Sequence, residues 1–311
     1  MPTIADTWRA AQARLAVARE VGSREGKQLV QHVLGIDETQ IILLDNNDFP
    51  VEKEPALEDL VSRRVAGEPL GYILGFAWFY GRTWAVGPGV LIPRPDTEIL
   101  VEECLRRMPD IRHNYNMLEL GVGSGCIGGT LLAERPEARY TGVEISESAW
   151  AIATENIAKN LEDMSENEAA SPPFAQEAPR PSPRRWNVVL QDGLDGIAGK
   201  FDLLVSNPPY VTDEEWAARE GEVKDFEPRL ALTGGEKNPD GLLFYRKLAA
   251  WGGELVRNGG WLCVEVGWRQ AEAVRELLQE HKNRDGTATW HEISVCKDLG
   301  GRDRVVCAQR V

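Results

Sequence analysis

The sequence lacks any long apolar run and any excess of basic residues. No stretch of its 311 residues approaches the roughly 18 to 20 apolar residues that a membrane-spanning helix needs. Asp and Glu outnumber Lys and Arg by 49 to 35, and the resulting net charge of −14 disfavours direct binding of nucleic acid. The N-terminus shows no apolar region followed by a cleavage site, which disfavours secretion. We therefore expect a soluble globular protein that contacts neither membrane nor nucleic acid.

Patterns typical of disulfides and metal sites are also missing. The five cysteines are scattered and form no Cys-x-x-Cys pair, which indicates a reducing compartment. The four histidines show no ligand-like spacing with one another or with the cysteines. The sequence therefore predicts no metal site.

The length predicts about two domains. In residues 1–75 apolar side chains recur at helical spacing, as in Trp8, Ala11 and Leu15, which predicts a helical domain. Residues 76–93 begin with aromatic and β-branched residues around a glycine and predict a β-hairpin linker. Residues 94–311 then alternate between helix and strand patterns, so we expect an α/β domain with a mostly parallel sheet covered on both faces.

The expected elements of this α/β domain can be given as ranges. Strands are predicted at 115–120, 139–144, 186–190, 201–206, 261–266, 288–295 and 304–310, and helices at 96–108, 125–134, 146–160, 240–256 and 269–281. Residues 162–185 interrupt the pattern, because they hold five prolines and almost no large apolar residues. They predict a disordered insertion.

A glycine-rich segment, LELGVGSGCIG (118–128), follows the first of these strands. Its glycines permit a tight turn and close approach of a ligand to the backbone, with the N–H groups of a helix behind it. Glu144 ends the next strand, where an acid can accept hydrogen bonds from ribose hydroxyls. A dinucleotide fingerprint, Gly-x-Gly-x-x-Gly, requires a glycine at the sixth position, where this sequence has Cys126, so we expect a nucleoside cofactor without a pyrophosphate.

A second segment, FDLLVSNPPYV (201–211), is an apolar strand that ends in a polar turn. The side-chain oxygen of Asn207 and the carbonyl of Pro208 can accept hydrogen bonds from a planar NH2 group, because Pro209 offers no competing N–H. Tyr210 offers a flat face that can stack on a planar substrate. Since ligands bind at the carboxyl ends of strands in such sheets, we expect this turn to face the nucleoside site.

These two segments, together with GEPLGYILG (67–75), LIPRPDTEILVE (91–102), FEPRLALTGG (226–235) and DLGGRDRVV (298–306), resemble the peptide chain release factor glutamine methyltransferases, the HemK/PrmC family. The resemblance runs from about residue 23 to the end, apart from residues 162–185. It implies a Rossmann-like class I methyltransferase domain with a seven-stranded sheet, preceded by a helical substrate-recognition domain and a hairpin.

The resemblance also implies an activity. A monomeric enzyme would transfer a methyl group from S-adenosylmethionine to the side-chain amide nitrogen of the glutamine in the Gly-Gly-Gln motif of a release factor, of bacterial or mitochondrial type. The Pro-rich insertion is atypical of bacterial members and favours a eukaryotic, mitochondrial member. Arg9, Arg14 and Arg19 lie in an amphipathic stretch that resembles the end of an organelle presequence, although an ordinary first helix in a cytoplasmic protein explains them equally well.

Site residues follow from the resemblance position by position. The cofactor's amino acid end would lie on Gly121, Val122, Gly123, Ser124 and Gly125. Glu144 would hold the ribose and Asp192 the adenine amino group, while Gly193 stands where the family tends to carry a bulky, often aromatic residue. Asn207, which would also lie beside the cofactor, would grip the substrate glutamine with Pro208, Pro209 and Tyr210. Asn207, Pro208 and Tyr210 would be the catalytic residues.

Two other functions are compatible with the sequence. An Asn-Pro-Pro-Tyr turn also suits enzymes that methylate the amino group of adenine in nucleic acid, although such an enzyme should carry a basic groove. A non-catalytic adaptor could keep the fold and bind translation factors without turnover. Methyl transfer from labelled cofactor distinguishes these possibilities.

Overall fold

The computed structural model describes residues 1–18, 22–169, 185–219, 221–235 and 237–311, without the side chains of 163–169. These residues form two compact units. The first consists of Met1–Phe76 together with Glu220–Phe226, and the second of Ala77–Arg219 together with Glu227–Val311. The hairpin after residue 76 thus groups with the second unit, and a short segment far along the chain groups with the first.

The first unit is helical. Its elements are α1 (Ile4–Ala18), α2 (Glu25–Leu34), α3 (Glu38–Leu43), η1 (Val51–Lys53), α4 (Glu54–Val65) and α5 (Leu70–Leu74), with the distant α10 (Glu222–Phe226). Leu15, Leu29 and Ile41 are fully buried in its core. Gly26 lets α2 approach α1 closely, since a Cβ there would lie 2.5 Å from the backbone nitrogen of Gln12.

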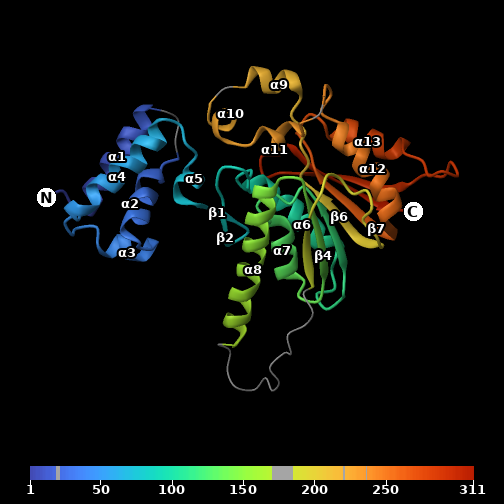
Figure 1. Cartoon of the computed structure of the whole chain (residues 1–311), viewed down its shortest axis with the longest axis horizontal. Coiled ribbons are helices and arrows are strands. Elements are labelled where there is room, and N and C mark those ends of the chain that lie inside the picture. The colour runs from blue at the N-terminus through green and yellow to red at the C-terminus, as the bar shows by residue number, and fades with distance from the viewer. Residues whose placement is uncertain (19–21, 170–184, 220, 236) are drawn as a thin grey trace. The chain divides into compact units, whose positions relative to one another are not determined.

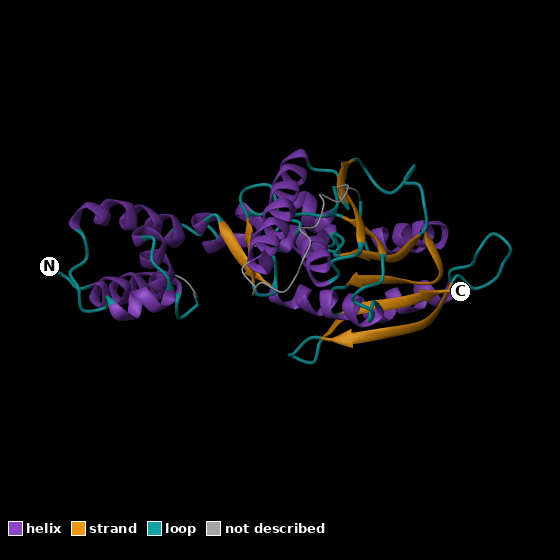
Figure 2. Cartoon of the chain, turned by 90° about the horizontal axis from the view of Figure 1, so that it is seen from below, coloured by secondary structure: helices purple, strands orange, loops and turns teal. Residues whose placement is uncertain are grey.

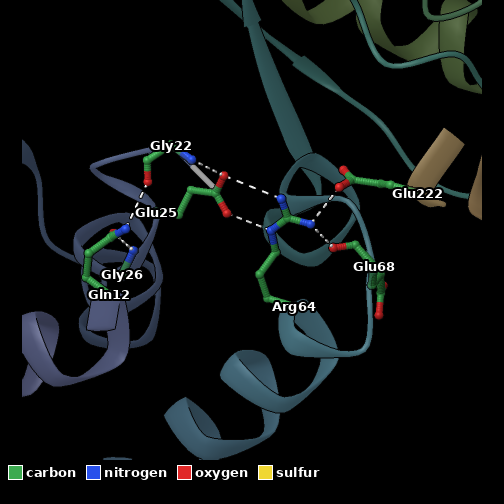
Figure 3. A network of polar contacts seen from close by, with 7 residues as sticks. All are labelled: Gln12, Gly22, Glu25, Gly26, Arg64, Glu68 and Glu222. Atoms are coloured by element: carbon green, nitrogen blue, oxygen red, sulfur yellow. Dashed lines mark hydrogen bonds and ion pairs between the residues drawn. The ribbon is translucent and has the colours of Figure 1, made fainter. Parts of the chain in front are cut away.

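Helix α10 joins the first unit through a buried arginine (Figure 3). Arg64 of α4 donates from Nε to Glu25 of α2 at 2.6 Å and from Nη1 to Glu222 of α10 at 2.9 Å. Its Nη1 also donates to the backbone carbonyl of Glu68 at 2.9 Å. The guanidinium is almost completely shielded from water, so it needs these acceptors to remain charged inside the unit. Arg64 is therefore the residue that connects α10 to α2 and α4.

The second unit is an α/β domain around a seven-stranded sheet (Figures 1 and 2). The strands are β1 (Phe76–Phe79), β2 (Arg82–Ala85), β3 (Asn116–Leu120), β4 (Arg139–Glu144), β5 (Trp186–Leu190), β6 (Phe201–Ser206), β7 (Val256–Glu265), β8 (Trp290–Lys297) and β9 (Asp303–Arg310). The helices are η2 (Pro95–Thr97), α6 (Glu98–Arg107), α7 (Cys126–Glu134), α8 (Glu147–Ala169), α9 (Asp213–Ala218), α11 (Arg229–Thr233), α12 (Leu243–Leu255) and α13 (Ala271–Glu280).

The sheet has the order β5-β4-β3-β6-β7-β9-β8, and β9 runs antiparallel to both of its neighbours while the remaining pairs are parallel. Helices α6, α7 and α8 cover one face and α12 and α13 the other (Figure 1). The central strands β3 and β6 are buried on both faces and mostly apolar, as a doubly covered sheet requires. The predicted fold class is confirmed.

The β1–β2 hairpin packs on the second unit through Trp84. This side chain is fully buried, and Gly129 of α7 leaves room for its ring, since a Cβ at Gly129 would lie 2.5 Å from the ring. Asn156 of α8 exchanges hydrogen bonds with both backbone groups of Ala85 and donates to the carbonyl of Ser124 at 2.8 Å. The hairpin thus helps to fix the glycine-rich turn that contains Ser124.

Two predictions about elements need correction. Helix α8 continues to Ala169, so residues 162–169 are helical where disorder was predicted; Glu, Ala and Met favour a helix, and no proline interrupts one before residue 172. The rest of the predicted insertion, apart from Arg185, lies outside the described residues. Helices α9, α10 and α11 were not predicted, because five or six residues are too few for a recognisable apolar period.

In the described ranges, no helix combines the length and the apolar character that a membrane span requires. In the same residues, no three His, Cys, Asp or Glu side chains gather closely enough to hold a metal ion. All five cysteines are free thiols.

Candidate active site

A cavity of about 380 Å³ lies at the carboxyl ends of the central parallel strands. Leu120 at the end of β3, Glu144 at the end of β4 and Ser206 at the end of β6 all line it. Its volume is typical of a site for a small molecule, and ligands of doubly wound sheets bind at this edge.

Most of the predicted site residues meet in this cavity. Those that line it are Gly121, Val122, Gly123, Ser124, Glu144, Asp192, Gly193, Asn207, Pro208 and Pro209. Two predicted residues, Gly125 and Tyr210, are not among the lining residues. The structure thus brings the glycine-rich turn, the acid of β4 and the Asn-Pro-Pro turn to a single enclosure.

The glycine-rich turn presents bare backbone to the cavity. Gly121 and Gly123 have φ angles of 75° and 58°, which favour glycine, and a Cβ at either residue would meet no atom within 4 Å. Side chains at these positions would therefore fill open space rather than clash with the protein. This is the cradle expected where a ligand must approach main-chain atoms.

Glu144 ties the turn to the end of β4. Its Oε2 accepts a hydrogen bond from the N–H of Gly123, and its Oε1 accepts from the N–H groups of Ile145 and Ser146, each at 2.9 Å. Because each carboxylate oxygen can accept two hydrogen bonds, Oε2 retains one lone pair. The carboxylate fixes the turn and can also accept a hydrogen bond from a hydroxyl group of a ligand.

The orientation of the Asn207 amide follows from its neighbours. Thr97 donates its hydroxyl hydrogen to Glu265 at 2.6 Å, and this leaves the Thr97 oxygen only as an acceptor. Asn207 must therefore point Nδ2 at Thr97, from which it lies 3.3 Å. Oδ1 is then left for a ligand in the cavity, because Asn207 is one of the lining residues.

Asn207, Thr97 and Glu265 form a relay of hydrogen bonds. Glu265, its last member, is completely buried at the end of β7. Burial raises the pKa of Glu265 to about 7, against the lowering effects of the Thr97 hydroxyl and the nearby Arg304. Arg304 forms ion pairs with Asp96 at 2.9 Å and Asp298 at 3.2 Å. The relay thus changes charge near neutral pH.

A second ion pair lies at the rim of the cavity. Arg94, a lining residue, pairs with the buried Glu227, whose Oε2 also accepts from the N–H of Ile92 at 3.4 Å. The following residue, Pro228, lines the cavity as well. The pair therefore joins the segment before η2 to the segment before α11, and both segments contribute wall.

Gly125 and Tyr210 serve the scaffold around the cavity. At Gly125 a Cβ would lie 3.1 Å from the carbonyl oxygen of Ala153, so this glycine permits α7 and α8 to pack closely. The Tyr210 ring packs against the core under α12 and α13, and burial raises its pKa to about 12. Its carbonyl accepts a hydrogen bond from Gln270 at 3.1 Å.

Sequence reasoning missed one wall of the cavity, which α12 provides. Phe244, Lys247 and Trp251 of this helix all line the cavity. Their spacing of three and four residues places them on one helical face, which was the available signal. From the sequence, this segment was predicted only to be a helix at 240–256, without a role in the site.

Glu119 of β3 is a buried acid next to the site that does not line the cavity. Its Oε2 accepts the hydroxyl of Tyr140 at 2.6 Å, and burial raises the pKa of Glu119 to about 8. It supports the strand beneath the glycine-rich turn.

Comparisons with known proteins agree with this geometry. The sequence family described as "PrmC N-terminal domain" matches residues 6–75, and the family described as "Methyltransferase small domain" matches residues 95–223. The "Release factor glutamine methyltransferase" of Bacteroides thetaiotaomicron is 37% identical over 278 residues, with 89% of each chain covered. The chain belongs to the release factor glutamine methyltransferase family.

Further members of this family extend the similarity along nearly the whole chain. The enzyme of that name from Caulobacter vibrioides is 36% identical over 306 residues, which cover 98% of this chain and 95% of the relative. A crystal structure described as a release factor-specific protein-(glutamine-N5) methyltransferase, from Alicyclobacillus acidocaldarius, is 28% identical, with a TM-score of 0.40 over 73% of this chain and 99% of that one. Membership confirms the predicted enzyme class and its cofactor, S-adenosylmethionine.

Proposed function

We propose that this protein transfers a methyl group from S-adenosylmethionine to the side-chain amide nitrogen of the glutamine in the Gly-Gly-Gln motif of a peptide chain release factor. The observation that carries the proposal is the single cavity, in which a glycine cradle and an acid adjoin the Asn207-Pro208 acceptors. Relatives named as release factor glutamine methyltransferases support the choice of substrate.

The residues present fit the cofactor. The open space beside Gly121 and Gly123 suits its amino acid end, which needs main-chain contacts rather than side chains. The remaining lone pair on Glu144 suits a ribose hydroxyl, and Asp192 lines the cavity where it can accept from the adenine amino group. The acids of the site also suit a cationic ligand.

When bound, S-adenosylmethionine supplies a methyl group on a sulfonium, which is already an activated electrophile. An amide nitrogen is a poor nucleophile, because its lone pair is delocalised into the carbonyl. Asn207 Oδ1 and the Pro208 carbonyl would accept hydrogen bonds from the two N–H groups of the substrate amide and so would hold its nitrogen in line with the methyl group. Such alignment can supply about 7 to 11 kcal/mol in favourable systems.

The same acceptors would stabilise the positive charge that develops on nitrogen as the N–C bond forms and the S–C bond to the sulfonium breaks. One amide proton then leaves to water, and no side chain is assigned as an obligatory base. Thr97 and Glu265 are positioning residues, because they hold the Asn207 amide with Oδ1 free. The chemistry therefore depends on orientation rather than on proton transfer.

Mass spectrometry tests the proposal directly. The protein is incubated with S-adenosylmethionine and with each candidate release factor, and the Gly-Gly-Gln peptide is then analysed. The expected result is a gain of one methyl group on the glutamine. Cofactor binding without methylation of any release factor would favour the non-catalytic adaptor, and transfer to adenine in nucleic acid would favour the other alternative; either result overturns the proposal.

The monomeric state and the mitochondrial compartment stay predictions from the sequence. The latter rests on the Pro-rich segment and on the basic N-terminal stretch, of which Arg19 lies outside the described residues. Arg14 binds Glu58 and α1 buries Leu15, so this stretch also serves the fold of the first unit. Imaging of a C-terminally tagged chain beside a mitochondrial marker tests the compartment, and light scattering tests the monomer.

A further inference from the structure

Gly193 and Trp251 are close neighbours in the wall of the cavity. A Cβ at Gly193 would lie 2.9 Å from both Cη2 and Cζ2 of the Trp251 ring, which is closer than real Cβ contacts allow. A side chain at 193 and the present position of the Trp251 ring therefore exclude each other. Both residues line the cavity, on the side where Asp192 also lines it.

The Trp251 ring is held by one edge. Its Nε1 donates to Asp195 at 3.1 Å, and Cζ2 and Cη2 on the same edge lie against Gly193. The loop itself is braced by Gln191, whose Nε2 donates to the carbonyls of Gly193 and Asp195 at 2.8 and 3.0 Å. The loop thus fixes the position of the Trp251 ring, which is one of the side chains that line the cavity.

The neighbouring residues of α12 extend this aromatic wall. Phe244 lies two helical turns before Trp251 and packs over Gly234, where a Cβ would lie 2.1 Å from its ring. The ammonium group of Lys247 lies 5.2 Å from the centre of the Phe244 ring. The part of the wall that α12 provides thus includes two planar side chains, Phe244 and Trp251, which suit a planar heterocycle rather than an aliphatic ligand.

We propose that Trp251 provides the face on which the adenine of S-adenosylmethionine stacks, and that Gly193 is a glycine because the ring needs its space. The aromatic surface comes from helix α12 instead of from the residue after Asp192. This inference rests on the proposed function only in its choice of cofactor.

Calorimetric binding of S-adenosylhomocysteine to the full-length chain tests the inference. Trp251→Ala should weaken binding about 10- to 100-fold, since stacking of a base on an aromatic ring is worth that much on alanine substitution. Trp251→Phe keeps a planar face and should lose less than about 5-fold. The affinity for methylthioadenosine, which lacks the amino acid end, should fall in Trp251→Ala by the same factor as the affinity for S-adenosylhomocysteine.

Thermal unfolding without ligand separates this role from a merely structural one, because Trp251 also packs against the core. Binding of Trp251→Ala within about twofold of wild type would overturn the inference. Equal losses in Trp251→Ala and Trp251→Phe, both with wild-type unfolding temperatures, would overturn it as well. If wild type itself fails to bind S-adenosylhomocysteine, the proposed function fails instead.

A double-mutant cycle provides a test that does not require an unperturbed Trp251→Ala variant. Gly193→Ala pushes a methyl group against the ring, so it should weaken binding in the wild-type background and much less in the Trp251→Phe or Trp251→Ala background. Gly196→Ala is the matched control: its φ of 81° resembles the 71° of Gly193, but its Cβ would meet no atom within 4 Å. An equal effect of Gly193→Ala in all backgrounds would overturn the inference.

Discussion

The end of the cavity beside Glu144 and the end beside Gly193 are built from different materials. At the first, the wall is the main chain of consecutive residues, Gly121–Ser124, tied to one carboxylate. At the second, the wall consists of side chains from α12, far along the chain from Gly193. A wall made of main chain must come from one contiguous stretch of sequence. A wall made of aromatic side chains can be supplied by a different element, provided that a glycine leaves space for the ring.

The largest effect is expected at Asn207, which lines the same cavity but belongs to neither of these two parts of the wall. Asn207→Ala removes the acceptor that orients the substrate nitrogen, so turnover on a release factor should fall at least about 100-fold. Binding of S-adenosylhomocysteine should change little, because neither end is altered. Turnover with labelled cofactor and calorimetry measure the two quantities.

Asn187→Ala is the matched control for this prediction, because Asn187 is an exposed asparagine on β5 outside the cavity. It should leave both turnover and binding at wild-type values. Near wild-type turnover of Asn207→Ala would refute the role given to its side chain.

The main-chain end should fail when its carboxylate is removed. Glu144→Ala leaves the N–H groups of Gly123, Ile145 and Ser146 without their acceptor, and the turn loses its shape. We expect the Kd for S-adenosylhomocysteine to rise about 10- to 100-fold, because hydrogen bonds to charged groups are worth about 1.5 to 3 kcal/mol. Isothermal titration calorimetry measures it.

Glu147→Ala tests the specificity of that loss, since Glu147 is exposed, lies close to Glu144 in sequence and does not line the cavity. Its Kd should remain that of wild type. If Glu144→Ala also retains the wild-type Kd, the main-chain end does not depend on the carboxylate and the comparison between the two ends breaks down.

The relay of Asn207, Thr97 and Glu265 should make turnover decrease at acid pH. The pKa of Glu265 is raised to about 7, so its charged form, which accepts the Thr97 hydroxyl, decreases as the pH falls from 8 to 6. Turnover should decrease with it while the Kd stays constant. Glu265→Gln keeps an oxygen for Thr97 but does not titrate near pH 7, so its profile should be flat there.

Thr97 offers the matching pair of variants. Thr97→Val removes the acceptor for Asn207 Nδ2 and should lower kcat about 10-fold, as loss of an orienting partner typically does. Thr97→Ser keeps the hydroxyl and should retain most of the activity. Equal activities of the two variants would contradict a relay.

The smallest effect on binding is expected at Glu119, which lies outside the cavity wall. Its pKa is raised from 4.5 to about 8, so the folded state holds the proton more tightly and stability should decline as the pH rises through this range. Glu119→Gln should remove at most about 5 kcal/mol of this decline in the free energy of unfolding. Chemical unfolding at several pH values measures it, and the remaining decline is expected from Glu265.

Patterns in the sequence predicted the sheet because its central strands are short apolar runs separated by amphipathic helices. Strands β4, β5 and β6 have their predicted bounds. The cavity residues at the ends of these strands were predicted for the same reason, since parallel strands end at a common edge. Glu265 and Thr97 were not, because their contact joins residues distant in sequence, and no local pattern reports it.

Local signals that were available were weaker. Thr212 and Glu215 form a capping box, which could have predicted the start of α9. The segment 162–169 was wrongly predicted to be disordered from its low hydrophobicity, which limits burial but does not prevent helix formation. Trp251 was missed because its ring fills the space that a side chain at position 193 would need. A sequence does not show which large side chain fills the space beside a glycine.

Because helix α10 belongs to the first unit, the two units cannot be separated by dividing the chain at one position. The chain passes from one unit to the other three times, after Phe76, after Arg219 and after Phe226. A shortened chain that begins at Ala77 would still contain α10 but would lack Arg64, so Glu222 would lose this ion-pair partner. The stretch between the Asn-Pro-Pro-Tyr turn and Glu227 would then lose an attachment point. Isolating the catalytic unit thus requires redesign of this internal segment as well as removal of the N-terminus.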